Sequence, residues 1–171
     1  MVPDGCVGFA RVRRRVQDEC GFTLIELMVV VLIIGILIAI GLPTFLGARA
    51  RAQDAAAQAT LRTALTAGRV VYSTSSAHDA SDRYLDATIP ELQGVEASVV
   101  WVDQTTASTD PTTVSKDTTT GVLYLASYSH SGTCFFMYDD PPNDTRYAAV
   151  PATATDCYAA NNGGISWGTG W

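Results

Sequence analysis

The sequence predicts an α+β protein in which a long N-terminal helix packs on a small antiparallel β-sheet head. Three observations support this. An unbroken apolar run extends from Phe22 to Leu42, an alanine-rich amphipathic segment follows at 44–74, and short β-rich runs separated by turn residues occupy much of 98–150. Helical and strand segments that are segregated along the chain are typical of α+β folds. A length of 171 residues suits one small domain and an apolar segment.

The apolar run is long enough to cross a membrane. Between Phe22 and Leu42 only Thr23 and Glu26 are polar, and a helix of about twenty apolar residues spans a bilayer core. We therefore expect residues 22–43 to form a transmembrane helix. A carboxylate inside such a helix costs roughly 2.5 to 3.5 kcal/mol at mid-membrane, so Glu26 indicates a specific partner.

The order of the segments before the helix differs from an ordinary secretory signal. Arginines at 11, 13, 14 and 15 come first, and the small residue Gly21 precedes the apolar run. A secretory signal has its small-residue cleavage site after the apolar region. Cleavage after Gly21 would instead remove residues 1–21, a cytoplasmic leader, and keep the helix.

The six residues from Gly21 to Glu26, Gly-Phe-Thr-Leu-Ile-Glu, resemble the processing signal of type IV prepilins and of the related type II secretion pseudopilins. The resemblance covers roughly residues 11–55. It implies that a prepilin peptidase cuts after Gly21 and that Phe22 becomes the N-methylated first residue. It also implies that Glu26 pairs with the terminal amine of a neighbouring subunit.

The physical properties of these residues agree with the resemblance. A methylated amine stays cationic and neutralises Glu26 in an apolar filament core, where an unpaired charge is costly. Gly35 and Pro43 also match pilin positions. Together with Gly41 they lower the helix propensity of the segment, by about 1 kcal/mol for each glycine and about 3 kcal/mol for the proline. We therefore expect this segment to bend or melt on assembly. The alternative is a single-pass anchor whose Glu26 snorkels to the interface.

Residues 44–74 continue the helix with a different surface. The segment has two stripes at helical spacing, a polar one at Arg51, Asp54 or Ala55, Gln58, Arg62 and Arg69, and an apolar one at Leu61, Ala64, Leu65, Gly68 and Tyr72. One helix of about fifty residues is expected. It should end within Ser73–Ser76, where hydroxyls compete for backbone hydrogen bonds.

The globular head is expected at 75–171, with three or four antiparallel strands. It should begin with a loop at 75–97 that has a helical turn around Pro90–Leu92, followed by a strand at 98–102 and a turn or mobile loop from Thr105 to Thr120. A hairpin of 121–128 and 133–138 and an edge strand at 146–150, ended by Pro151, should complete the sheet. The glycine-rich tail from Asn161 has two tryptophans that we expect to dock on the head.

The four cysteines divide by compartment. Cys6 and Cys20 lie in the leader, which the resemblance places in the cytoplasm. Cys134 and Cys157 lie in the exported part, where disulfides persist, so we expect one bond between them. The net charge is −6 for the whole sequence. An acidic chain argues against nucleic-acid binding as the main role.

The sequence has only incomplete matches to the motifs of enzymes and metal sites. Gly164–Gly168 matches G-x-S-x-G, but only three residues follow, so the acid and histidine of a hydrolase cannot come after it. His78 and His130 lack a neighbouring cysteine or histidine at metal-ligand spacing. The acidic turn 139–144 does not follow the EF-hand spacing and is expected to be solvated. We therefore expect neither an enzyme nor a cofactor or metal site.

Together these features predict a structural pilin subunit, held in the cytoplasmic membrane as a single-pass precursor and then polymerised into a surface filament. The resemblance implies four kinds of partner: further copies of the chain, a prepilin peptidase, an assembly ATPase and a membrane platform protein. The alternatives are a type II secretion pseudopilin and a minor tip or adhesin subunit. Pseudopilins commonly carry a calcium loop near the C-terminus and pilins a disulfide, which favours the pilin.

Overall fold

The computed structural model describes residues 21–74, 84–85, 87–141 and 144–171. The chain divides into two compact units, Met1–Leu42 and Pro43–Trp171. One helix, α1, runs from Leu24 to Thr74 over 51 residues, which confirms the single long helix and an end within the expected serine-rich segment. Residues 1–20 of the predicted leader, including Cys6 and Cys20, lie outside the described residues, as does His78.

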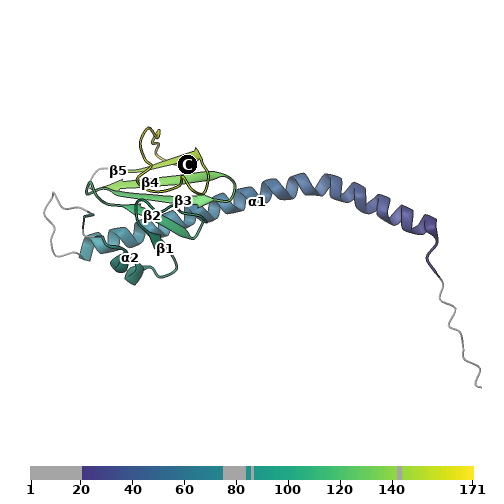
Figure 1. Cartoon of the computed structure of the whole chain (residues 1–171), viewed down its shortest axis with the longest axis horizontal. Helices are drawn as coiled ribbons and strands as arrows, with labels where there is room; N and C mark the ends of the chain where they lie inside the picture. Colours follow the sequence, from purple (N-terminus) through teal and green to yellow (C-terminus); the bar gives the residue numbers. More distant parts are fainter. Residues whose placement is uncertain (1–20, 75–83, 86, 142–143) are drawn as a thin grey trace, which may run out of the picture. The chain divides into compact units, whose positions relative to one another are not determined.

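The second unit is a five-stranded sheet that lies over the later turns of α1 (Figure 1). Helix α2 (Ile89–Val95) is followed by β1 (Val100–Val102), β2 (Thr113–Asp117), β3 (Leu123–Ser129), β4 (Thr133–Asp140) and β5 (Asp144–Pro151). The strands lie in chain order. The helical turn expected around Pro90–Leu92 is therefore confirmed as α2, and β5 is an edge strand that ends at Pro151.

The prediction of a loop from Thr105 to Thr120 was wrong, because this segment contains β2. Val114 is fully buried in the core, and Ser115 on the other face of the strand is also fully buried. Ser115 accepts a hydrogen bond from the backbone N–H of Ala159 at 3.0 Å. The sequence did not reveal this strand because its polar side chains are buried under a segment more than forty residues away.

The sheet is also not wholly antiparallel. Strand β1 pairs with β2 in parallel, with Trp101 opposite Val114, whereas the other three pairings are antiparallel. The connection between β1 and β2 contains tight turns at Asp103 and Asp110, whose carboxylates accept hydrogen bonds from backbone N–H groups two residues further on. Such turns reverse the chain, so the segment returns to the starting end of the sheet before β2 begins.

The main core lies between α1 and the inner face of the sheet. The helix contributes residues of the predicted apolar stripe, and the strands contribute alternate positions. Its buried members include Leu61, Ala64, Leu65, Val114, Leu123, Leu125, Phe135 and Met137. A smaller cluster on the outer face contains Ala126, Cys134, Phe136, Ala148 and Cys157. The two clusters cover both faces of the central strands, β3 and β4.

Gly68 lies at a close approach of α1 to the sheet. A Cβ atom at this position would lie 2.4 Å from Cδ2 of Leu123, which is itself fully buried. We expect Gly68→Ala to destabilise the head by about 1 kcal/mol, because overpacking costs about 1 to 3 kcal/mol and alanine returns up to about 1 as the better helix former.

The measurement is denaturant unfolding of the full-length chain in detergent micelles, followed by tryptophan fluorescence, since all three tryptophans lie in the second unit. Gly94→Ala in α2 is the matched control, because nothing lies within 4 Å of its Cβ position. The control should be neutral or slightly stabilising. Equal effects of the two substitutions would contradict the close-approach argument.

Candidate functional site

The segment with the predicted processing site begins outside the helix. Gly21, Phe22 and Thr23 precede α1 in irregular, exposed chain, and the Phe22 side chain is 79% exposed. The bond between Gly21 and Phe22 is therefore in non-helical backbone. A protease needs such an accessible, unfolded segment to bind the backbone on both sides of the scissile bond.

Thr23 and Glu26 form a reciprocal pair at the start of α1. The backbone N–H of Glu26 donates to Oγ1 of Thr23 at 3.2 Å, and Oε2 of Glu26 faces the backbone N–H of Thr23 at 3.5 Å. This is the arrangement of a capping box, in which each side chain satisfies an unpaired N–H of the helix terminus. The T-x-x-E spacing is the sequence signal for this box, and it was not among the predicted features.

The capping box fixes where the Glu26 carboxylate lies. It is held at the N-terminal end of α1, beside Thr23, the residue that follows Phe22. An acid in the first turn is stabilised by the helix dipole. Glu26 thus has a local role in the helix and also lies next to the position where cleavage after Gly21 would create a new amine.

The first part of α1 is apolar on all sides and unburied. An 18-residue window of it has a mean hydropathy of 3.0, and none of that window is buried. The exposed side chains include Leu24, Ile33, Leu37 and Ile40. A helix that is apolar all round has no solvated face. By length and composition, this segment therefore fits a membrane span.

Gly35, Gly41 and Pro43 all lie inside α1. The Cβ positions at Gly35 and Gly41 have no neighbouring atom within 4 Å, so no contact within the described chain requires glycine there. Pro43 lacks the N–H that would bond the carbonyl of Ala39, and it is the first residue of the second compact unit. Glycine and proline have low helix propensities, and the two glycines are not required by packing within the described residues.

A second polar cluster lies in the head and joins α1 to the sheet. Asp139, on β4, is 3% exposed and accepts hydrogen bonds from Arg69 on α1, the Tyr84 hydroxyl and Thr145 on β5. Nη2 of Arg69 lies 2.6 Å from Oδ1 of Asp139. The predicted solvated turn at 139–144 was therefore wrong for Asp139, because three donors distant in sequence bury its carboxylate.

The partners of Asp139 determine its charge state. Burial raises its pKa, but the hydrogen bonds from Arg69, Tyr84 and Thr145 favour the anion more strongly, and the net effect is a lowered pKa. Burial of the Tyr84 hydroxyl, together with its hydrogen bond to Asp139, raises the pKa of that tyrosine well above its ordinary value. Asp139 is ionised and Tyr84 neutral at physiological pH.

The lowered pKa of Asp139 predicts an acid-sensitive head. A carboxyl group with a lower pKa in the folded state contributes stability above its unfolded pKa of about 3.9, and that contribution is lost as pH falls through the folded value. We expect the unfolding free energy of the full-length chain to fall below about pH 4 and to fall less steeply in Asp139→Asn. Parallel pH profiles of the two proteins would contradict this role.

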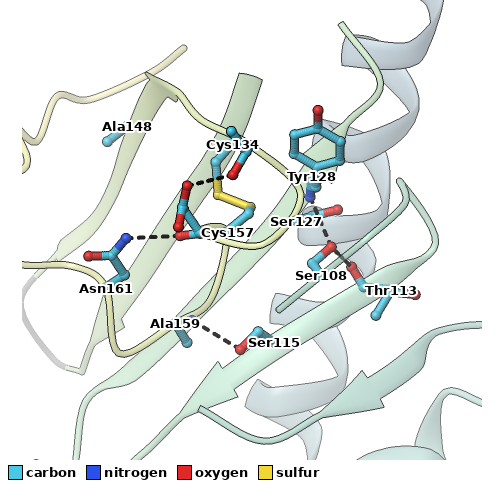
Figure 2. Close-up of a disulfide and its surroundings, with 12 residues drawn as sticks. Ser108, Thr113, Ser115, Ser127, Tyr128, Cys134, Ala148, Cys157, Ala159 and Asn161 are labelled. Atoms are coloured by element: carbon cyan, nitrogen blue, oxygen red, sulfur yellow. Dashed lines mark hydrogen bonds between the residues drawn. A yellow bond between two sulfur atoms is a disulfide. The ribbon is translucent and has the colours of Figure 1, made fainter. Parts of the chain in front are cut away.

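The expected disulfide is present and joins β4 to the C-terminal loop. Cys134 and Cys157 are bonded, with Cα atoms 5.5 Å apart, and both are fully buried. Figure 2 shows the hydrogen bonds that surround them. Ser108 accepts from the Tyr128 N–H at 2.9 Å and donates to the Thr113 carbonyl at 2.6 Å. The disulfide therefore fixes the C-terminal loop around Cys157, which covers β2 and the outer face of the sheet.

The remaining sequence candidates do not form a chemical site in the described residues. His130 lies exposed in the turn between β3 and β4, as expected of a turn histidine, and contacts Tyr128. Gly164–Gly168 follows β5 in irregular chain, and Trp167 within it packs on Tyr138. Among the residues that the structure describes, no group of three His, Cys, Asp or Glu is placed to hold a metal.

Comparison with known proteins gives two matches. A family model described as the prokaryotic N-terminal methylation motif matches residues 17–42. The type IV major pilin protein PilA of Myxococcus xanthus (strain DK1622) is 43% identical over 76 residues. The chain is a homologue of a type IV major pilin.

Both matches cover only part of the proteins compared. The alignment covers 44% of the chain and 32% of the Myxococcus pilin, so the chain matches about a third of that relative's length. No solved structure matches the chain. The methylation motif contains Gly21, Phe22, Glu26, Gly35 and Gly41 and ends one residue before Pro43.

Proposed function

We propose that this chain is the subunit of a type IV pilus filament, processed after Gly21, N-methylated on Phe22 and polymerised through its apolar helix. The observation that carries the proposal is an unburied apolar helix that begins with a capped acid, Glu26, inside a methylation motif. In this proposal residues 1–21 form the discarded leader, 22–43 the membrane and filament-core helix, and 75–171 the outward-facing head.

The assembly step pairs two charges in an apolar environment. Cleavage frees the amine of Phe22, and methylation leaves it cationic. Glu26 of one copy neutralises the amine of another, because each group alone would be an unpaired charge among apolar helices. The pairing sets the axial position of each subunit, since apolar side chains by themselves give no strong register.

Gly35, Gly41 and Pro43 supply local flexibility in the same segment. The Cβ positions of the two glycines have no neighbouring atom within 4 Å, and each of the three residues lowers helix propensity. A helix that must leave a bilayer and pack among copies of itself has to adapt its local geometry. We propose that this weakened segment bends or unwinds during that step.

The partners follow from this cycle. The chain associates with copies of itself and is a substrate of a prepilin peptidase. Before assembly it resides in the cytoplasmic membrane as a single-pass protein, and after assembly it lies in a surface filament. The assembly ATPase and membrane platform protein of type IV pilus systems are the proposed machinery.

The decisive experiment determines the N-terminus of the mature protein. Surface fibres are sheared from cells, purified and analysed by mass spectrometry. The proposal requires fibres made mainly of this chain, beginning at methylated Phe22. A mature protein that starts downstream of residue 43, or that keeps residues 1–21, would overturn it.

Two alternative functions, a minor pilus subunit and a secretion pseudopilin, can be distinguished from the major pilin subunit by experiment. A minor tip or adhesin subunit would be present in the fibres only in trace amounts. A type II secretion pseudopilin would depend on calcium for the stability of its head. The disulfide between Cys134 and Cys157 favours the pilin, and chelator should leave unfolding of the full-length chain unchanged while a reducing agent lowers its stability.

A further inference from the structure

The last nine residues, Gly163–Trp171, form a strap around the free edge of the sheet. Gly168 pairs with Tyr147 of β5 through two backbone hydrogen bonds, of 2.8 and 2.9 Å. Before this bridge, Trp167 packs against Tyr138 and Tyr124 on the outer face. After it, Trp171 packs against Tyr147 and Phe135 in the core cluster on the inner face. The strap therefore places one tryptophan on each face of the sheet.

Additional contacts hold the second tryptophan. The Trp171 Nε1–H donates to the Ala148 carbonyl at 3.0 Å, and the Arg62 guanidinium of α1 lies 5.3 Å from its ring centroid. Such cation–π contacts attract electrostatically. The site for Trp171 is thus formed by β4, β5 and α1, and it recognises an indole by shape, one hydrogen bond and charge.

The strap occupies the position that an added strand would take. An edge strand presents unpaired N–H and C=O groups that pair readily with another chain. Here the strap supplies one residue pair, at Gly168, and two aromatic anchors. Recognition of this form, with backbone pairing at an edge and pockets for alternate side chains, is the mode by which sheets bind extended peptides.

The strap can leave without opening the head. Its base is fixed by the disulfide at Cys157, and Gly163 and Gly164 follow as exposed residues, Gly164 with a φ of +77° that favours glycine. Beyond them the strap contacts the sheet through the bridge, through the two tryptophans and through Ile165, which packs on the outer cluster. Nine extended residues reach roughly 30 Å, enough to meet a neighbouring subunit.

We propose that the β5 edge is a peptide-binding site that takes a Trp-Gly-x-Gly-Trp segment, and that its second occupant is the strap of another copy of this chain. In the isolated chain the strap fills its own site. Between copies held side by side, it exchanges and links neighbouring heads. The exchange rests on the proposed filament, whereas the binding site itself does not.

The binding site is tested with the strap as a separate peptide. A fluorescent peptide of residues 163–171 is added to the full-length chain and to a chain ending at Asn162, both in detergent micelles. We expect the shortened chain to bind the peptide at least tenfold more tightly, because the intact strap competes. A peptide with both tryptophans replaced by alanine is the matched control and should not bind.

Failure of the shortened chain to bind, with its circular dichroism unchanged, would overturn the site. Equal binding to both chains would also overturn it. If the shortened chain does not fold, Trp171→Ala in the full-length chain replaces it, since this variant loses the inner-face anchor and should bind the peptide more tightly than the wild type.

Exchange between copies is tested separately with single cysteines. Continuing the register of the bridge places Ser166 opposite Ala149, and both residues are exposed. Ser166→Cys and Ala149→Cys are placed in copies with different tags and assembled together. A disulfide between the two tags is expected, and a double variant in one chain is the control for bonding within a copy.

Bonding in the double variant without any bond between tags would overturn the exchange. A chain without introduced cysteines shows the background from the native thiols. If the peptide binds but no filament forms, the proposed function fails while the site stands. If filaments form and the peptide does not bind, the site fails while the proposed function stands.

Discussion

Replacing Glu26 by alanine is expected to leave the chain in the membrane and to abolish filament formation. The apolar helix that inserts is unchanged or more apolar, so insertion persists. The amine of Phe22 would lose its anionic partner in the filament core, where an unpaired buried charge costs several kcal/mol. The measurements are membrane fractionation and the amount of sheared surface fibre, which should fall at least a hundredfold.

The capping box makes a sharper version of this experiment possible. Glutamine serves at the N3 position of a capping box as glutamate does, so Glu26→Gln keeps the cap and removes the charge. Thr23→Ala removes the threonine half of the cap and keeps the charge. We expect Glu26→Gln to block assembly and Thr23→Ala to permit it.

The reverse pattern would show that Glu26 acts only in the helix terminus. Normal fibres from Glu26→Gln would contradict the charge pairing directly. Peptidase processing is followed in the same samples by the size of the chain, so that a block before cleavage is not mistaken for a block in assembly.

Replacing Asp139 by alanine is expected to destabilise the head by about 3 kcal/mol. The substitution removes the shared acceptor of Arg69, Tyr84 and Thr145. Breaking a buried ion pair typically costs about 3 to 5 kcal/mol, but the Arg69 side chain is 55% exposed and regains water. The buried Tyr84 hydroxyl does not, and an unsatisfied buried group costs about 1 to 3 kcal/mol.

Denaturant unfolding of the full-length chain in micelles, with tryptophan fluorescence, measures this loss. Asp144→Ala is the matched control, because Asp144 also pairs with an arginine, Arg146, at 2.7 Å but is 61% exposed. Exposed pairs contribute about 0 to 1 kcal/mol, so the control should change stability little. A similar loss in both variants would contradict the importance of burial at Asp139.

The strands show the limit of sequence patterns most clearly. The hairpin of β3 and β4 was predictable, since two β-rich runs flank Ser129–Gly132. Strand β2, Thr-Val-Ser-Lys-Asp, was not, because only Val114 is strongly apolar and Ser115 is buried by a distant loop. The parallel pairing of β1 and β2 was equally hidden, since it depends on where the connecting turns return the chain.

The polar contacts of α1 show the same division. Arg69 falls in the predicted polar stripe of the helix, and nothing near it in the sequence points to Asp139, seventy residues away. The capping box of Thr23 and Glu26 is different, because a three-residue spacing is visible in the sequence. Local hydrogen bonds can be read from spacing, whereas long-range ones require the fold.

The sequence by itself determined the apolar helix, its amphipathic continuation and the methylation motif, because each follows from composition, periodicity or local spacing. It also determined the pairing of Cys134 with Cys157, because these are the two cysteines outside the predicted leader. Only the tertiary structure decided the burial of Asp139, the second strand of the sheet and the strap that places Trp167 and Trp171 on opposite faces of β5. Those features arise where segments distant in sequence satisfy each other's backbone and side-chain groups, and no local pattern records such a meeting.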